Sequence, residues 1–217
     1  MQKVIMLKRD ASIINGGLTQ TSKMPCKSYS LPTEACRTGF KMSKIPGSIC
    51  STCYADKGFY SMYANTIKPA QFARLDSIDS PLWVESMISS IGTDPYFRWH
   101  DSGDIQNLAH LEKIAEICRA TPNTRHWLPT REYAIVKSYV AKHGSIPENL
   151  TIRLSAMYPD VPVKIPASLA GIAGITTSNV HSKKPAIGEA CRAPSQNGEC
   201  RDCRACWTST VISYALH

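Results

Sequence analysis

The sequence contains no apolar run that approaches the roughly 18–20 residues of a membrane-spanning helix. Its start offers only a short apolar run, residues 4–7, before charged residues follow, which is too short for an export signal. A phosphate-binding glycine loop, an H-E-x-x-H zinc motif and a nucleophile elbow are also missing. We therefore expect a soluble, cytoplasmic protein without a membrane partner, outside the P-loop, zinc-protease and α/β-hydrolase classes.

Charge is also scarce, since only 19% of the 217 residues are charged. The 25 Lys and Arg residues outnumber the 17 Asp and Glu residues, which gives a formal net charge of +8. The basic residues occur in short pairs, such as Lys183/Lys184, and no long basic run is present. The basic excess leaves nucleic acid open as a partner, while the 43% of hydrophobic residues predicts a folded domain.

Cysteine, in contrast, is abundant, with nine residues. Structural disulfides are rare inside cells, so this number indicates metal or iron–sulfur ligation. Eight cysteines form two sets of four, and four thiolates are the usual ligands of a zinc ion or a [4Fe–4S] cluster. The first set is Cys26, Cys36, Cys50 and Cys53, and the second is Cys191, Cys200, Cys203 and Cys206.

The second set is the primary metal-site candidate, with the pattern C-x8-C-x2-C-x2-C followed by Trp207. Zinc sites usually combine two separate C-x2-C pairs, whereas cysteines at i, i+3 and i+6 suit a loop that wraps a larger cubane. Cys191 would then supply the fourth ligand. The spacing favours a [4Fe–4S] cluster, with zinc as the alternative cofactor and metal-free thiols as the third interpretation.

The first set is looser and predicts a second metal site less directly. Cys50 and Cys53 form a C-x2-C pair, but Cys26 and Cys36 lie upstream in a stretch punctuated by Gly and Pro. Three interpretations remain: all four bind a second cluster, only the C-x2-C pair matters, or that pair joins the second set. Cys118 falls on the apolar face of a predicted helix, where we expect a buried core residue.

Between the two sets, strand and helix patterns alternate. Helices are predicted at 80–91, 105–119, 131–143 and, briefly, 166–171; strands are predicted at 96–100, 125–128, 150–155, 174–177 and, at one edge, Lys3–Leu7. This alternation predicts an α/β fold: a partial barrel or an open, mostly parallel sheet of about four to six strands with flanking helices. We expect one domain over residues 1–217, divided into an irregular cysteine-bearing part (1–79), an α/β core (80–180) and a C-terminal cysteine loop (181–217).

Polar residues follow the predicted strands, where parallel α/β folds bind their ligands. We expect one cleft there, in which His100 and Asp101 are acid–base partners and Arg131 holds an anion. The catalytic candidates are His100, Asp101, Asp104 and Arg131, and the cofactor-binding candidates are Ser102, Thr130, Arg153, Ser155 and Thr177. Taken singly, Asp104 and Thr130 are equally explained as helix caps, and Asp101 as a turn residue.

Four segments carry a family resemblance. They are Cys50-x2-Cys53-Tyr54-Ala55-Asp56-Lys57-Gly58, Arg98-Trp99-His100-Asp101-Ser102-Gly103-Asp104, Trp127-Leu128-Pro129-Thr130-Arg131 and Cys200-x2-Cys203-x2-Cys206-Trp207. In this order they resemble the phage-encoded family labelled gene product eighty-eight, over most of the chain. The resemblance implies a virus-encoded protein that works in the bacterial host cytoplasm, and it implies no particular reaction. A weaker resemblance is to radical S-adenosylmethionine enzymes, which pair partial α/β barrels with [4Fe–4S] clusters, although their C-x3-C-x2-C loop is absent here.

Three functions follow from these observations. The leading interpretation is a phage iron–sulfur protein with one or two [4Fe–4S] clusters, redox-active or similar to radical S-adenosylmethionine enzymes, whose partner is a small molecule or a redox protein. The alternative is a zinc-stapled nucleic-acid-binding protein. The third is an iron–sulfur enzyme that uses the strand-end cleft, for which the sequence names no substrate.

Overall fold

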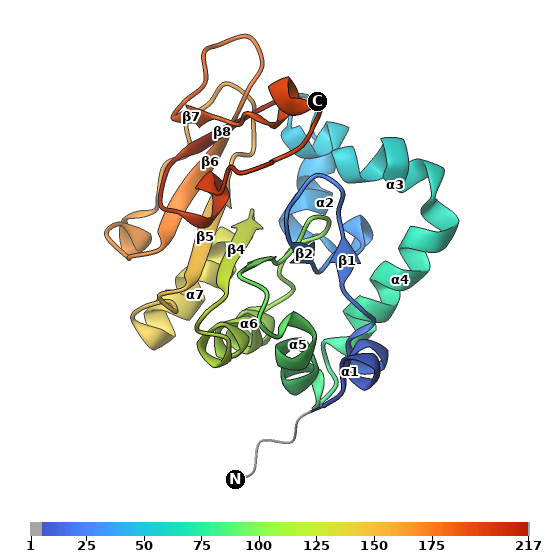
Figure 1. Ribbon diagram of the computed structural model, residues 1–217. Coiled ribbons are helices and arrows are strands. Elements are labelled where there is room, and N and C mark those ends of the chain that lie inside the picture. The colour runs from blue at the N-terminus through green and yellow to red at the C-terminus, as the bar shows by residue number, and fades with distance from the viewer. Residues whose placement is uncertain (1–5, 217) are drawn as a thin grey trace.

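The computed structural model describes residues 6–216, which form a mixed α/β fold built on an open sheet (Figure 1). Within these residues the sheet has eight strands in the order β1-β2-β3-β4-β5-β6-β8-β7, and the only antiparallel pair is β1 with β2. The strands are β1 (Thr19–Gln20), β2 (Lys27–Ser28), β3 (Tyr96–Arg98), β4 (Arg125–Thr130), β5 (Leu150–Ser155), β6 (Ile175–His181), β7 (Glu189–Ala190) and β8 (Ile212–Ala215). The predicted open, mostly parallel α/β sheet is therefore confirmed, and it does not close into a barrel.

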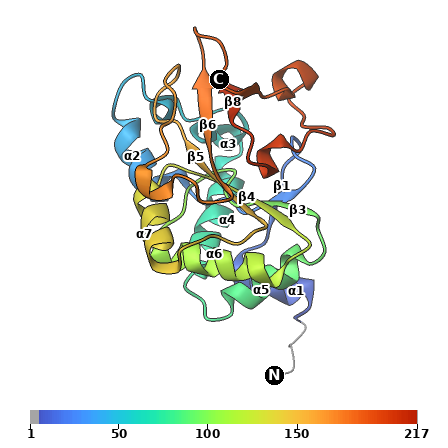
Figure 2. The ribbon, with the colours of Figure 1, turned by 90° about the vertical axis from the view of Figure 1, so that its left-hand side faces the viewer.

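Helices cover one face of the sheet, and the C-terminal segment lies on the other (Figures 1 and 2). The helices are α1 (Lys8–Asn15), α2 (Arg37–Ser43), α3 (Gly58–Met62), α4 (Ala64–Ser77), α5 (Trp83–Ile91), α6 (Leu108–Ala120) and α7 (Tyr133–His143). The segment predicted to be helical at 166–171 is a 3-10 turn, Ala167–Leu169. Within the described part of the chain, no helix is long and apolar enough to cross a bilayer.

The two faces of the sheet differ because successive side chains of a strand point to opposite sides. Phe97, Leu128 and Ile152 point toward the helices and belong to the main apolar core. Their strand neighbours Trp127 and Arg153 face the other way, toward the C-terminal segment. The α/β alternation therefore produces an apolar helix side and a more polar side that receives the cysteine loop.

The main core also contains Cys118, which is fully buried on α6. This position confirms its predicted role as a packed core residue. The start of α6 differs from the prediction, because the side chain of Asn107 caps it by accepting a hydrogen bond from the His110 amide (2.8 Å). Asp104 is therefore not the cap of this helix, although it accepts a hydrogen bond from the Ile105 amide (2.8 Å).

The N-terminal part is more regular than predicted, since four helices, α1 to α4, lie before residue 80. The sequence does not predict α4, because the apolar residues of this helix do not gather on one face and Pro69 lies inside it. The edge strand predicted at Lys3–Leu7 lies largely outside the described residues. Leu7 is extended and directly precedes α1.

Candidate metal centre

The cysteines of the second set lie close together on the face of the sheet opposite the helices. The amide of Cys191 donates to the carbonyl of Ser213 in β8 (2.8 Å), and the amide of Cys203 donates to the carbonyl of Cys200 (2.9 Å). Burial raises the pKa of the Cys200 thiol, and the nearby thiols of Cys191 and Cys203 raise it further. Burial also raises the pKa of the Cys206 thiol, and the nearby Cys191 thiol raises it further. All four predicted ligands therefore share one neighbourhood.

Cys26 joins this neighbourhood, which the sequence did not indicate. It precedes β2, and the amide of Cys200 donates to the carbonyl of Lys23 in the same segment (2.9 Å). Burial raises the pKa of Cys26 to about 12, and the Cys200 thiol contributes to the increase. The buried members of this second apolar core are Met24, Cys26, Trp127 and Trp207. We call Cys26, Cys191, Cys200, Cys203 and Cys206 the five-thiol group.

Arg153 holds the loop of the five-thiol group in place. It is completely buried in β5, and every nitrogen of its guanidinium donates to backbone carbonyls. The acceptors are the carbonyls of Cys206 (3.0 Å from Nε), Thr177 and Thr210 (3.1 and 2.7 Å from Nη1), and Ala205 and Thr208 (2.9 and 2.7 Å from Nη2). These five bonds use the whole donor capacity of an arginine. Arg153 therefore anchors the main chain, and the structure leaves it no donor for the cofactor-binding role expected from the sequence.

Positive charge surrounds the five-thiol group. The charges of Lys23 and Arg98 oppose the burial-driven increase in the pKa of Cys200, and those of Arg153 and Arg98 do so for Cys206. The Arg98 guanidinium lies 4.5 Å from the centre of a Trp127 ring, and its buried Nε has no hydrogen-bond partner within residues 6–216. A [4Fe–4S]²⁺ core with four thiolates has a net charge of about −2, so this environment suits an anionic cluster.

At the carboxyl edge of the sheet, Asp104 connects the ends of β3 and β4. Its carboxylate accepts hydrogen bonds from the Thr130 hydroxyl (2.6 Å) and from the amides of Arg131 (2.8 Å) and Ile105 (2.8 Å). Burial nevertheless raises its pKa to about 6, because desolvation outweighs these three bonds. Asp104 and Thr130 are thus bonded to each other, which favours a structural role for both.

Asp101, just beyond the end of β3, binds residues from three separate places in the N-terminal part of the chain. One carboxylate oxygen accepts a hydrogen bond from the Ser28 hydroxyl (2.7 Å), and the other accepts one from the Tyr60 hydroxyl (2.7 Å). The Tyr54 hydroxyl donates to the Asp101 carbonyl. The neighbouring Ser102 hydroxyl is buried without a partner in the described residues. Asp101 therefore connects β2 and the tyrosines to the end of β3.

His100 lies apart from the expected acid–base pair. Its Nδ1 is 2.9 Å from the carbonyl of Tyr29, and its ring packs against Trp99 and His110. Burial lowers its pKa to about 4, so the ring is neutral at physiological pH. No hydrogen bond joins its side chain to Asp101 within residues 6–216. This position favours packing over acid–base chemistry.

The last two cofactor-binding candidates belong to the neighbouring strands. The Ser155 hydroxyl accepts a hydrogen bond from Ser178 (3.3 Å), and its carbonyl accepts one from Tyr133 (2.7 Å). Thr177 contributes its carbonyl to Arg153. Both residues are therefore engaged in contacts between strands and loops.

The remaining cysteines of the first set, Cys36, Cys50 and Cys53, lie beside Arg131 at the carboxyl edge. The charge of Arg131 lowers the pKa of all three thiols, against the larger increase caused by burial. We call these residues the three-thiol group. In the part of the chain that the structure describes, no three His, Cys, Asp or Glu side chains already converge as an ion site.

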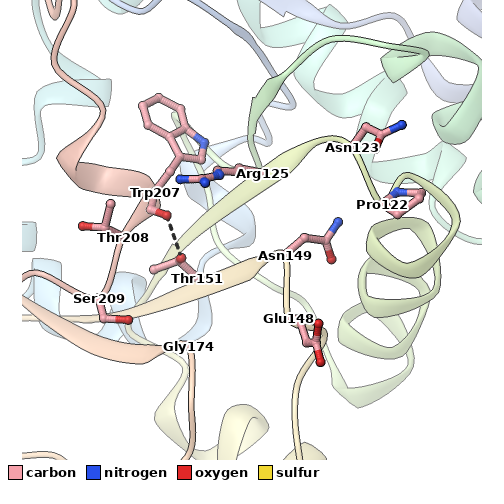
Figure 3. A pocket seen from close by; sticks show the side chains of 10 residues that line it. All are labelled: Pro122, Asn123, Arg125, Glu148, Asn149, Thr151, Gly174, Trp207, Thr208 and Ser209. Carbon is pink, nitrogen blue, oxygen red and sulfur yellow. Dashed lines mark hydrogen bonds between the residues drawn. The ribbon is translucent and has the colours of Figure 1, made fainter.

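A surface pocket of about 410 Å³ lies at the opposite, amino-terminal edge of the sheet (Figure 3). It is lined by Arg125 at the start of β4, Thr151 near the start of β5, Gly174 just before β6, and the C-terminal segment. The Thr151 hydroxyl donates to the Trp207 carbonyl across it (3.2 Å). This pocket is therefore separate from the cleft expected at the strand ends.

Acid is expected to destabilise the protein, because three buried histidines are held neutral. Burial lowers the pKa of His100 to about 4, that of His126 to about 3, and that of His110 well below its usual value. Between pH 6.5 and about 4 the unfolded chain binds more protons at these sites, so stability falls as pH falls, by up to about 1.4 kcal/mol per pH unit for each histidine. Asp104, with its raised pKa, opposes this trend below pH 6.

Urea unfolding of the metal-free protein between pH 4 and 7 measures this dependence. The matched variant is His126→Gln, whose amide can keep a hydrogen bond to the Thr121 hydroxyl, which lies 2.9 Å from Nε2 in the native ring. We expect the variant to show a shallower dependence, by about one proton. A stability that stays constant or increases on acidification would contradict the assignment.

Of the comparisons with known proteins, the one with family models gives a match. No curated protein and no solved structure matches the chain. The weaker resemblance to radical S-adenosylmethionine enzymes therefore stays a prediction. The family model described as gene product 88 matches residues 6–209, nearly the whole chain, and includes both thiol groups. The chain belongs to the gene product 88 family.

Proposed function

We propose that this gene product 88 protein is an iron–sulfur protein that binds a [4Fe–4S] cluster through Cys191, Cys200, Cys203 and Cys206. The observation that carries the proposal is the proximity of these thiols on a loop with i, i+3 and i+6 spacing. The loop rests on a rigid support, because Arg153 binds its carbonyls and Trp207 packs beneath it.

The electrostatics also support a cluster at this position. Burial raises the pKa of Cys200 and Cys206, so these two thiols are protonated without metal and their ligation would release protons. Lys23, Arg98 and Arg153 provide positive charge that would stabilise the bound anionic cluster. The buried aromatic side chains of Trp127 and Trp207 would restrict solvent access and so influence its reduction potential.

Anaerobic reconstitution with iron and sulfide tests the proposal. We expect the double variant Cys200→Ser/Cys206→Ser to bind about four fewer iron atoms and four fewer sulfides per chain than the unmodified protein. Cys118→Ala is the matched control, since this thiol lies in the main core and its loss should leave the iron content unchanged. One zinc bound by the group and no iron would contradict the proposal and favour the zinc-stapled alternative.

The fifth thiol provides a sharper test of the ligand set. Cys26→Ser should keep the cluster, whereas Cys203→Ser should lose it, if the four residues of the C-terminal segment are the ligands. Iron and sulfide content, with circular dichroism as the check on folding, separates the two variants. Loss of iron in Cys26→Ser alone would show that Cys26 replaces Cys203.

A further inference from the structure

The three-thiol group is left without a fourth cysteine once Cys26 is placed. Cys26 lies at the amino end of β2 beside Cys200, and the three-thiol group lies by Arg131, beyond the carboxyl end of β4. The surroundings of Gly39 show that two sulfurs of the three-thiol group are close to each other. A Cβ atom built on Gly39 would be 3.5 Å from the Cys36 sulfur and 3.8 Å from the Cys50 sulfur. The fold thus brings together thiols that are separated by thirteen residues.

Both loops that carry these thiols are tied to the sheet. Cys36 directly precedes α2, where the amide and hydroxyl of Thr38 donate to the Glu132 carboxylate (2.6 and 2.8 Å). The amide of Ile49, next to Cys50, donates to the carbonyl of Met157 beyond β5 (2.9 Å). The positions of the three thiols are therefore set by the ends of β4 and β5.

The neighbouring carboxylates are already engaged. Asp104 accepts three hydrogen bonds and Glu132 accepts two. Asp56 accepts one from the Thr33 hydroxyl (2.6 Å). A cubane has four irons, and three thiolates ligate only three of them. The fourth iron would take its ligand from a bound molecule or from water.

Arg131 is placed to bind such a molecule. Its Nε donates to the carbonyl of Ala156 (2.9 Å), which fixes the guanidinium at the edge. Within residues 6–216, its two terminal nitrogens donate no hydrogen bond. Guanidinium groups with two parallel free donors bind carboxylates in a bidentate manner. The charge of Arg131 acts on all three thiols, so its free terminal nitrogens lie on the same side of the molecule as the three-thiol group.

We propose that Cys36, Cys50 and Cys53 hold a second [4Fe–4S] cluster whose fourth iron binds a carboxylate-bearing small molecule, oriented by Arg131. The type of metal rests on the proposed function, and the ligand count rests on the geometry of the edge. The proposed site lies at the carboxyl ends of the strands, where the sequence predicted ligand binding.

The first test examines the missing fourth thiolate. In the Cys200→Ser/Cys206→Ser background only the second cluster should remain, with about four irons per chain. Ferricyanide should accept one electron from it: [4Fe–4S]²⁺ gives [3Fe–4S]⁺, one released Fe²⁺ and the electron. We expect the [3Fe–4S]⁺ signal by electron paramagnetic resonance, and expect none from Cys36→Ser/Cys50→Ser/Cys53→Ser, whose remaining cluster has four thiolates.

The outcomes separate the two centres. No iron in the Cys200→Ser/Cys206→Ser background, with four irons in the triple variant, would overturn the second cluster and leave the first intact. Zinc in that background would overturn it as well. A second cluster that keeps all four irons on oxidation would show a complete ligand set and overturn the open position. The circular dichroism spectrum of each variant confirms that it is folded.

The second test uses citrate as a carboxylate probe on the dithionite-reduced Cys200→Ser/Cys206→Ser protein. Citrate should change the paramagnetic resonance spectrum, and Arg131→Gln should weaken its binding at least tenfold. Arg125→Gln is the matched control, because it removes an exposed arginine at the opposite edge of the sheet. An unchanged spectrum, or equal weakening by both substitutions, would overturn the proposed ligand site.

Discussion

Arg153→Leu is expected to lower the free energy of unfolding by about 3–5 kcal/mol, because five backbone carbonyls lose their buried donor. Leucine fills part of the space without replacing any hydrogen bond. Four of the carbonyls belong to the segment 205–210, so this segment should also detach from β5. Urea unfolding of the metal-free protein measures the first effect, and the rate of tryptic cleavage after Arg201 and Arg204 measures the second.

Two further substitutions make this expectation specific. Arg153→Lys keeps the charge but has only three donors, so it should lie between leucine and the native arginine. Arg125→Leu removes an exposed arginine from the neighbouring strand, and its effect should stay within about 0.5 kcal/mol. A loss below about 1 kcal/mol for Arg153→Leu would mean that the loop finds other donors. The anchoring role would then be wrong.

Gly103→Ala should cost about 2–5 kcal/mol, from two separate causes. Gly103 has a φ of +80°, a conformation that alanine adopts at a cost of about 1–2 kcal/mol. Its Cβ would also lie 2.5 Å from the Cβ of Leu31 and 2.9 Å from the Leu31 carbonyl oxygen. Neither atom can move freely, because the amide of Leu31 donates to the Ser102 carbonyl (2.8 Å). Thermal or urea unfolding of the variant measures the total.

Gly47→Ala separates the two causes. Gly47 has the same φ of +80°, but a Cβ there would meet no atom within 4 Å. It should therefore show only the backbone penalty, about 1–2 kcal/mol. Equal losses at both positions would show that Leu31 and its segment move away at little cost. A larger loss at Gly103 would show that the close contact between the first segment and the end of β3 is rigid.

The sequence predicts the central strands well, because they are long and their pattern is local. The predicted strand at 150–155 coincides with β5 (Leu150–Ser155), and the helix that ends before Gly144 coincides in its last turn with α7. β2 could not be found in this way, since it has only two residues and exists through its pairing with β3. The placement of Cys26 near Cys200 depends on that pairing, so the spacing of the cysteines did not indicate it.

The polar residues of the strands were harder to interpret. A buried arginine in the middle of a strand has the same sequence signature whether it binds a ligand or anchors the main chain, and Arg153 anchors it. His100 likewise follows a strand, but its ring turns into the aromatic core. In both cases the deciding partners come from distant segments, which a single sequence does not reveal. The four C-terminal cysteines were easier to group, because they are close in the sequence and the structure keeps them in one neighbourhood.

The contact between Lys23 and Cys200 has a consequence for the assembly of the protein during synthesis. The five-thiol group is complete only after the segment with Cys200, Cys203 and Cys206 has left the ribosome and met β2. The contact between Lys23 and Cys200 closes a loop of nearly the whole chain, and this closure has an entropic cost that local contacts do not have. Cluster insertion at this site would thus be a late event, whereas the three-thiol group needs only the chain up to Met157, beyond β5. The two centres would be filled in a fixed order, the edge site before the loop site.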